Sequence, residues 1–384
     1  MRLTISMWAT IAAATLIAGV VPGQEVRPEV APFTGTPSEF APPALAPPVA
    51  APLETTPTET VPAFPEKSDL RAGTIEGFGM GGRGMGAGMG GPGMGGPGYG
   101  AAWYPSRPVS GSAPATDLGL VRQNLSAAVP VWRDGGELVL LSAGIRNATF
   151  FTDAILPDSH RPFPSELWNV HLGMNYMHKF DNGWSGGLGI SFGSASDRPF
   201  YSINEMNVGF NSFLQVPVWN ERDAWRFSLM YSPVGSLSFP IPGVAYLWNP
   251  AEDLRVSVGL PLAVMWRPVE DLTINLSYVP LTIVNARTTY GVADKLFIFG
   301  GFEWLQEAYL LADRENTADR FMGYEKRLIS GVRWDVWQHS SLEMDAGYAF
   351  DRKYGVGQNQ VNNLHDQVDI APGAFVSANF RIRF

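Results

Sequence analysis

The chain has 384 residues, a formal net charge of -9, 16% charged residues, 12% aromatic residues and no cysteine. Because no basic stripe concentrates positive charge, this mildly acidic composition argues against nucleic acid as a partner. The absence of cysteine excludes disulfides, thiolate metal sites, thiol catalysis and anchoring through a lipid-modified cysteine. The length is compatible with two or three domains, or with one large β architecture.

The first residues have the pattern of a secretory signal peptide, which we assign to residues 1–23. Arg2 supplies a positive charge, residues 7–21 supply an apolar core, and Gly19 and Gly23 are small residues suited to cleavage. The alternative is a membrane anchor, but the apolar run is short for the roughly 20 residues that span a bilayer. The breaker PGQ also follows it directly. The pattern therefore predicts export.

Residues 24–116 have the composition of a disordered linker. Residues 41–65 are rich in Pro, Ala and Thr, which is typical of a semi-rigid polyproline spacer, and residues 77–100 form a glycine tract with regularly spaced methionines. Such segments bury too little apolar surface to offset the conformational entropy of folding. The methionines could bind Cu(I). Since no His or Cys accompanies them, we favour a flexible linker.

From residue 117 to residue 384, short runs of alternating hydrophobicity are separated by turn residues. In residues 168–180 most apolar side chains share one parity, the turn DNG follows, and residues 184–192 continue the alternation. A period of two indicates strands with one apolar and one polar face, and DNG predicts a tight hairpin. Residues 256–266 keep phase through Pro261, so we expect one long strand with a bend or bulge at the proline.

Two features favour a membrane barrel over a soluble β-sandwich. Aromatic residues sit beside the expected turns, as Trp184, Trp225, Trp266 and Trp337 do, and this placement suits the boundary between hydrocarbon and headgroups. Charged residues occupy the polar parity within strands, and in lipid such a sheet must close so that no edge remains unpaired. The expected fold is all-β, an antiparallel transmembrane β-barrel of about 12 strands over residues 117–384.

In that barrel the strand that starts near Leu118 is expected to pair with the C-terminal strand. Short connections, such as RDGG, DNG, NERD and QHSS, are expected on the periplasmic side. The longer ones, residues 152–166, 312–321 and 351–367, are expected to face outside.

The C-terminal sequence ANFRIRF places Phe380, Ile382 and Phe384 on one face and Arg381 and Arg383 on the other. This ending resembles the signal that outer-membrane β-barrels present to the barrel-assembly machinery. With the export signal and the alternation, the chain is similar to an uncharacterised outer-membrane barrel family, a domain of unknown function. The resemblance implies location in the outer membrane, with lipid and the assembly machinery as partners.

No catalytic, cofactor or metal site is predicted. His171 and His178 lie seven residues apart, so on one strand they point to opposite faces and cannot share a metal. Ser185, Ser191 and Asn175 come near His171 in the expected hairpin, but none sits in a recognisable motif. We therefore expect no enzyme activity, although an outer-membrane esterase or lipase is a further alternative.

The candidate lumen-lining residues are the charged side chains of the last strands: Arg333, Asp335, Glu343, Asp345, Arg381 and Arg383. We expect the acids to lie opposite Arg333 and Asp335 across a hairpin, either as a structural ladder or as the lining of an ion-selective pore. The predicted function is a porin-like pore or passive channel for small solutes. The alternative is a structural barrel that contacts the cell wall or a partner through its N-terminal spacer.

Overall fold

The computed structural model describes residues 96–112, 115–218, 222–235, 239–279, 283–337, 339–358 and 364–382. All of them belong to one compact unit, Gly73–Arg383. The predicted signal peptide, the predicted linker up to residue 95, Arg383 and Phe384 lie outside the described residues. No helix in the described ranges has the length and apolar character needed to cross a membrane.

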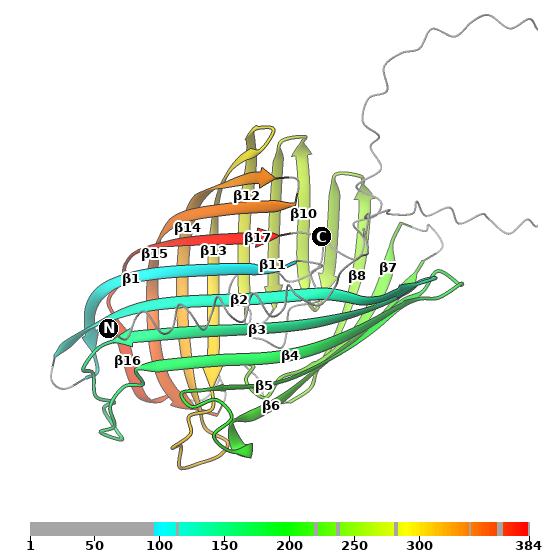
Figure 1. Cartoon of the computed structure of the whole chain (residues 1–384). Helices are drawn as coiled ribbons and strands as arrows, with labels where there is room; N and C mark the ends of the chain where they lie inside the picture. Colours follow the sequence, from blue (N-terminus) through cyan, green and yellow to red (C-terminus); the bar gives the residue numbers. More distant parts are fainter. Residues whose placement is uncertain are drawn as a thin grey trace, which may run out of the picture. The chain divides into compact units, whose positions relative to one another are not determined.

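The described residues form one 17-stranded sheet (Figure 1). Its strands are β1 (Gly98–Ser110), β2 (Thr116–Asp134), β3 (Glu137–Phe151), β4 (Glu166–Lys179), β5 (Ser185–Ser196), β6 (Met206–Pro217), β7 (Ala224–Tyr231), β8 (Ile241–Ala251), β9 (Leu254–Gly259), β10 (Leu262–Val269), β11 (Leu272–Val279), β12 (Ile283–Ala293), β13 (Leu296–Tyr309), β14 (Arg320–Trp337), β15 (Ser340–Gly357), β16 (His365–Ile370) and β17 (Gly373–Ile382), with the short helix η1 (Ile203–Glu205) before β6.

The sheet closes on itself as an antiparallel barrel. Each strand from β1 to β14 pairs with the next one along the chain, and β17 pairs with both β15 and β1. β16 also lies between β15 and β1, so β16 and β17 share one position in the ring. The barrel therefore has 16 strand positions plus one extra strand, and the expectation of about 12 strands is wrong.

One cause of the error is β1, which lies in the segment predicted to be a linker. Gly98–Ser110 pairs with β17 through Ala101↔Ala378 and with β2 through Ala101↔Gln123. At Gly100 a Cβ atom would lie 2.3 Å from the Oδ1 atoms of Asn124 and Asn379. The glycine therefore leaves room for its neighbours' side chains. The predicted boundary at residue 116 and the predicted closing pair of β2 with the C-terminal strand are both wrong.

A second cause lies at Pro261, where one long strand was expected. The chain instead reverses there, and β9 and β10 pair in antiparallel fashion through Val256↔Val264. Gly259 has a φ of 136°, a backbone conformation that residues other than glycine rarely adopt. The alternation keeps its phase through this hairpin, so the pattern alone could not distinguish a reversal from a continuous strand.

The outward face of the barrel is apolar. Leu172 is 65% exposed and Met344 59% exposed, whereas the inward-facing Leu167 and Ala349 are fully buried. Exposed aromatic side chains border the turns as predicted, including Trp184, Trp225, Trp266 and Trp337. A closed sheet with an apolar exterior is the form in which strands cross an outer membrane. The chain is therefore an outer-membrane protein, and a sandwich of two sheets is excluded.

The two ends of the barrel differ. At one, here called the turn end, lie the short connections β2–β3, β4–β5 and β14–β15. The start of β1 and the end of β17 lie at this end too, where Gly98 pairs with Arg381. At the other, the loop end, lie the long connections β3–β4, β13–β14 and β15–β16. The short and long connections are thus separated as predicted. Their assignment to periplasm and exterior stays a prediction.

Candidate functional site: the barrel lumen

Side chains that join strands distant in the ring identify the lumen. The Tyr104 hydroxyl on β1 donates to Glu325 on β14 at 2.8 Å. Arg122 on β2 lies 3.6 Å from Glu307 on β13. Since β1 does not pair with β14 and β2 does not pair with β13, the contacts cross the interior of the barrel. On each of these strands, the residues that share the parity of these side chains therefore point into the lumen.

At the loop end the lumen is filled by apolar side chains. Phe163, in the β3–β4 connection, makes edge contacts with Phe150, Phe321 and Tyr354, with ring centroids 5.1 to 5.5 Å apart. The same cluster includes the buried side chains Tyr104, Val109, Leu118, Leu120, Ala148, Ala154, Leu156, Leu167, Ala195, Val234, Phe299, Tyr309, Leu310, Ile329, Ala349, Val368, Ile370 and Phe375. We call this cluster the plug.

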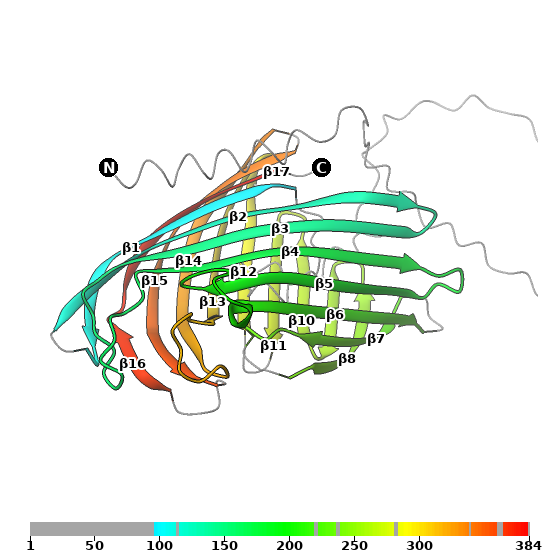
Figure 2. The same ribbon diagram turned by 60° about the horizontal axis from the view of Figure 1, so that its bottom comes forward.

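The tip of the β13–β14 hairpin crosses the loop end of the lumen. The Leu310 amide donates to the Ala195 carbonyl at 2.7 Å, which joins the end of β13 to β5 on the opposite wall. The next contacts are the Ala312 amide to Asp197 at 2.8 Å and Arg314 to the Asn204 carbonyl at 2.6 Å. Figure 2 shows this tip beside the segment before β6. The loop end is closed by folded chain as well as by side chains.

The β3–β4 connection is held over the lumen by polar contacts on two sides. Asp366 on β16 accepts hydrogen bonds from the amides of Asp158 and Ser159 at 2.8 and 2.7 Å, and its own amide donates to Asp158 at 2.6 Å. On the other side Arg161 donates to the Asp313 carbonyl at 2.9 Å. These contacts, here called the tethers, join the β3–β4 connection to β16 and to the β13–β14 connection, and they can break without disturbing the pairing of the sheet.

Next to the plug lies a buried network of charges. Glu325 accepts hydrogen bonds from Tyr104 at 2.8 Å and from Arg352 at 3.1 Å. Arg327 donates to the same tyrosine at 2.9 Å and forms an ion pair with Glu303. Glu303, Glu325 and Arg352 are all 3% exposed. Because desolvated charges are stable only when paired, loss of one member of the network leaves the charge of its partners uncompensated.

Toward the turn end some of the inward side chains are polar and reach water. Asn124 and Arg381 are exposed although they lie on the inward parity. A Cβ atom at Gly189 would lie 2.3 Å from Asn175 Oδ1 and 2.5 Å from Asn211 Nδ2, so this glycine makes room for a row of amides. On β2 the exposure of inward residues thus rises from the plug to the turn end, whereas Leu140 on β3 and Glu343 and Asp345 on β15 are inward residues of this half that are buried.

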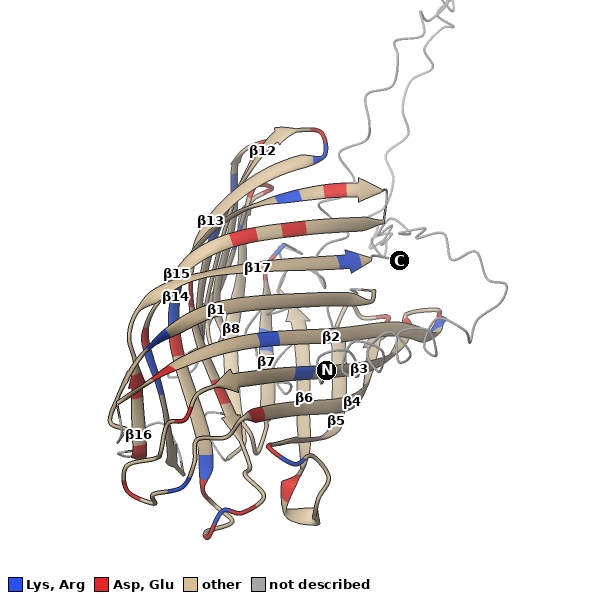
Figure 3. Cartoon of the chain, turned by 60° about the vertical axis from the view of Figure 1, so that its left-hand side comes forward, with Lys and Arg blue, Asp and Glu red and all other residues tan. Residues whose placement is uncertain are grey.

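The predicted lumen candidates lie on the inward parity in this polar half, and Figure 3 shows their strands β14, β15 and β17 side by side. Arg333 lies 3.4 Å from Asp335, and Ser377 donates to Asp345 at 2.7 Å. Glu343 lies opposite Arg333 in the register, as predicted. Arg383 is outside the described residues, and the role of all these side chains in passage stays a prediction.

The predicted ladder is only partly correct. Asp335 lies opposite Ser341, and Asp345 lies opposite Gly331, so neither faces a charge directly across the hairpin. Glu343 forms its ion pair with Arg287 of β12, at 3.0 Å. The register of one hairpin could not predict this contact because it depends on the curvature of the barrel.

The assembly-signal residues Phe380 and Ile382 fall on the parity opposite to Arg381 and are half-buried, while Phe384 lies outside the described residues. Their recognition by an assembly machinery stays a prediction.

Sequence reasoning missed several charged residues of the lumen, most of them in the buried network. Glu303, Glu307, Glu325, Arg327 and Arg352 were not selected. The available signal was a carboxylate on the polar parity of a strand, as in FEWLQE and YEKR. Alternation in that region is weak, so the parity was uncertain there.

The histidines form no recognisable reactive group. His171 lies opposite Gly193, and its Nδ1 atom has no hydrogen-bond partner among the described residues. Ser185 pairs with Lys179, which lies at the far end of β4 from His171. In the described ranges no group of three or more His, Cys, Asp or Glu residues could hold a metal ion.

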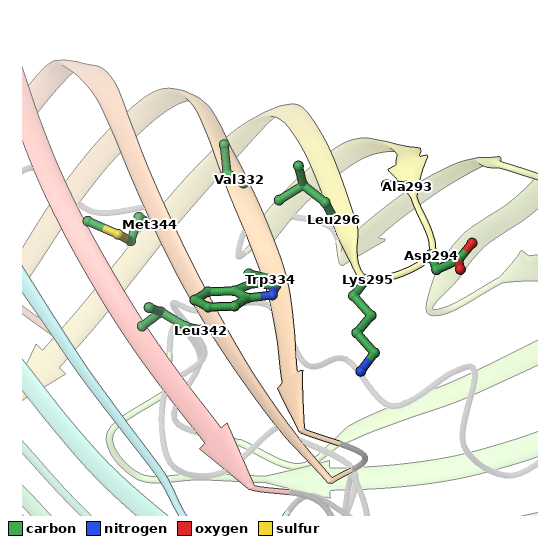
Figure 4. Close-up of a pocket in the computed structure, with 8 residues that line it drawn as sticks. All are labelled: Ala293, Asp294, Lys295, Leu296, Val332, Trp334, Leu342 and Met344. Carbon is green, nitrogen blue, oxygen red and sulfur yellow. The ribbon is translucent and has the colours of Figure 1, made fainter.

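A groove of about 740 Å³ lies on the outward face near the turn end (Figure 4). It is lined by Ala293, Asp294, Lys295, Leu296, Val332, Trp334, Leu342 and Met344. Trp334 and Met344 have the parity opposite to Arg333 and Glu343, so the groove faces lipid. It is not part of the lumen and cannot be a passage for solutes through the barrel.

No family model and no curated protein matches the sequence. The similarity to an uncharacterised barrel family therefore stays an expectation.

Among solved structures, the chain is similar to an outer-membrane channel from Pseudomonas putida F1, with 9% identity, 75% of this chain and 96% of that chain covered, and a TM-score of 0.31. It is also similar to a FadL homologue from Pseudomonas aeruginosa (12% identity, 75% and 89% covered, TM-score 0.34). A third match is the β domain of the Bordetella autotransporter BrkA (10% identity, 76% and 100% covered, TM-score 0.27). At such low scores the likeness carries no argument about function.

Proposed function

We propose that the protein is a gated channel for small solutes, open toward the turn end and closed at the loop end in this conformation. The observation that supports it most is the gradient of exposure along the inward face of β2. Asn124 is exposed, whereas Leu118 and Leu120 on the same strand are fully buried. A barrel that is only a structural shell has no need for water-accessible polar side chains such as Asn124 and Arg381 on its inward face.

The gate in this proposal is the β3–β4 connection. It contributes Phe163 to the plug, and its contacts to the wall are side-chain packing and the tethers. The hydrogen bonds that end at a carboxylate or a guanidinium contribute about 1.5 to 3 kcal/mol each at most. Movement of this connection, together with the β13–β14 hairpin tip to which Arg161 joins it, can therefore open the loop end while the sheet stays closed.

Planar-bilayer recording of the full chain tests the proposal. The combined Asp366→Ala and Arg161→Ala variant removes the tether contacts made by the Asp366 carboxylate and the Arg161 guanidinium and leaves only the Asp366 amide bond to Asp158. We expect it to raise the open fraction roughly tenfold or more because about 1.4 kcal/mol corresponds to one decade. Arg198→Ala is the matched control, since Arg198 is exposed and its ion pair is with the adjacent Asp197. Open fractions equal to those of the unmodified chain would contradict the gate. Absence of conductance in every variant would contradict the channel.

The second candidate is a structural barrel that uses its N-terminal spacer to contact the cell wall or a partner. The continuous plug favours it, because packing of this density blocks passage. Absence of enzyme activity likewise remains a proposal.

A further inference from the structure

The lumenal wall formed by β3 to β12 carries charges of only one sign. In the described part of these strands, every charged side chain of inward parity is a cation: Arg146, Lys179, Arg226, Arg255, Arg267 and Arg287. The carboxylates of these strands lie elsewhere. Glu137, for instance, accepts a hydrogen bond from the outward-facing Tyr176, and Asp223 accepts one from Tyr246.

The inward carboxylates are concentrated on β13 to β15; Asp345 accepts a hydrogen bond from Ser377, and the others are engaged by arginines. Glu303 pairs with Arg327, Glu307 with Arg122, Glu325 with Arg122, Arg327 and Arg352, Glu343 with Arg287, and Asp335 with Arg333. Their charge is therefore locally compensated. In the described strands inward cations therefore outnumber inward carboxylates, and no inward carboxylate lies on β3 to β12.

Several inward cations lie near the ends of their strands at the turn end of the barrel. Lys179 is the last residue of β4, Arg255 is the second residue of β9, and Arg381 is the last but one of β17. A solute that enters from the turn end meets these side chains before it reaches the plug.

Aromatic rings hold some of the inward guanidinium groups in place. Arg226 lies over the ring of Phe213 at 4.6 Å, and Arg333 lies over Phe297 at 4.0 Å. Arg226 is half-buried and forms no ion pair with any described residue. A ring stabilises the cation and leaves its charge uncompensated, so Arg226 contributes fully to the field of the lumen.

From these observations we propose that the lumen selects anions, and that the solutes of the proposed channel are small anions such as inorganic anions and short carboxylates. The inference rests on the proposed channel function. Rings of Arg and Lys side chains raise the local concentration of anions and exclude cations in other pores, and a cleft lined by one sign of charge enriches its counter-ion by tenfold or more.

The test is the reversal potential of the full chain in planar bilayers under a KCl gradient. We expect the reversal potential to have the sign of the chloride equilibrium potential. The expected anion-to-cation permeability ratio is roughly ten. The combined Arg226→Glu and Arg267→Glu variant should lower that ratio several-fold, whereas Arg226→Lys, which keeps the charge, should leave it unchanged. Lys295→Glu is the matched control, because Lys295 is exposed in the β12–β13 turn at the outward groove.

The outcomes separate the two proposals. Conductance with a reversal potential at zero, or of the sign set by potassium, overturns the anion inference and leaves the channel standing. An unchanged ratio in the double glutamate variant also overturns it, because the cationic wall would then not set the selectivity. Absence of conductance in the tether variant overturns the channel and the inference together.

Discussion

Deleting Gly98–Ser110 is expected to abolish the folded barrel. β1 pairs with β2 on one side and with β17 on the other, antiparallel in both cases. Without β1 those two strands run parallel to each other and must either pair in a new register or leave their edges open. An open edge in hydrocarbon leaves backbone groups without partners, at several kcal/mol each. The measurement is heat-modifiable migration of membrane-extracted protein on gels, and we expect the shift to be lost.

The matched control removes residues 41–53, a segment of the same length in the predicted linker, and should leave the heat-modifiable shift intact. A chain that begins at residue 117 and still shows the shift would contradict closure through β1. Deletion of both segments should behave like deletion of β1 alone, because the loss of β1 already opens the ring.

Replacing Glu325 is expected to cause the largest loss of stability among single substitutions in the lumen. Arg327, Arg352 and Arg122 all lie within 3.9 Å of its carboxylate. Glu325→Ala leaves these guanidinium groups without their common partner in a desolvated site. Removal of one partner from a buried ionic group costs about 3–5 kcal/mol, measured as a lower urea midpoint for the folded protein in detergent.

The adjacent Lys326 provides the control for this substitution. It lies on the outward face of the same strand and forms an ion pair with Asp351 at 2.6 Å, both side chains being partly exposed. Exposed ion pairs contribute about 0–1 kcal/mol, so Lys326→Ala should change the midpoint little. Equal losses for the two variants would mean that the inward network is not desolvated.

The sequence predicted the fold class and the facing of most strands, because alternation is a local property. Hairpins such as that of β4 and β5, around the DNG turn, follow directly from it. The strand count did not, for two local reasons. The strand around Gly100 is rich in glycine and so has the composition of a linker. At Pro261 the chain reverses while the alternation keeps its phase, so the hairpin has the pattern of one continuous strand.

The contents of the lumen were less accessible to prediction. Parity shows which side chains point inward, and it placed Arg333 and Glu343 opposite each other. It cannot show which inward residues meet across the ring, as Arg287 meets Glu343 and Tyr104 meets Glu325. Nor could it show that Phe163, in a connection, would fill the loop end, because such contacts join segments far apart in the chain.

The central claim is a lumen that admits water from the turn end up to the plug and no further. Single-cysteine labelling tests it most directly, since the chain has no cysteine of its own. Asn124→Cys and Leu120→Cys place one thiol on the same inward face of β2, one below the plug and one within it. With a membrane-impermeant maleimide applied to the turn end of the folded barrel, we predict rapid labelling at position 124 and protection at position 120. Equal labelling of both positions would contradict the closed loop end, and protection of both would contradict the water-accessible lumen.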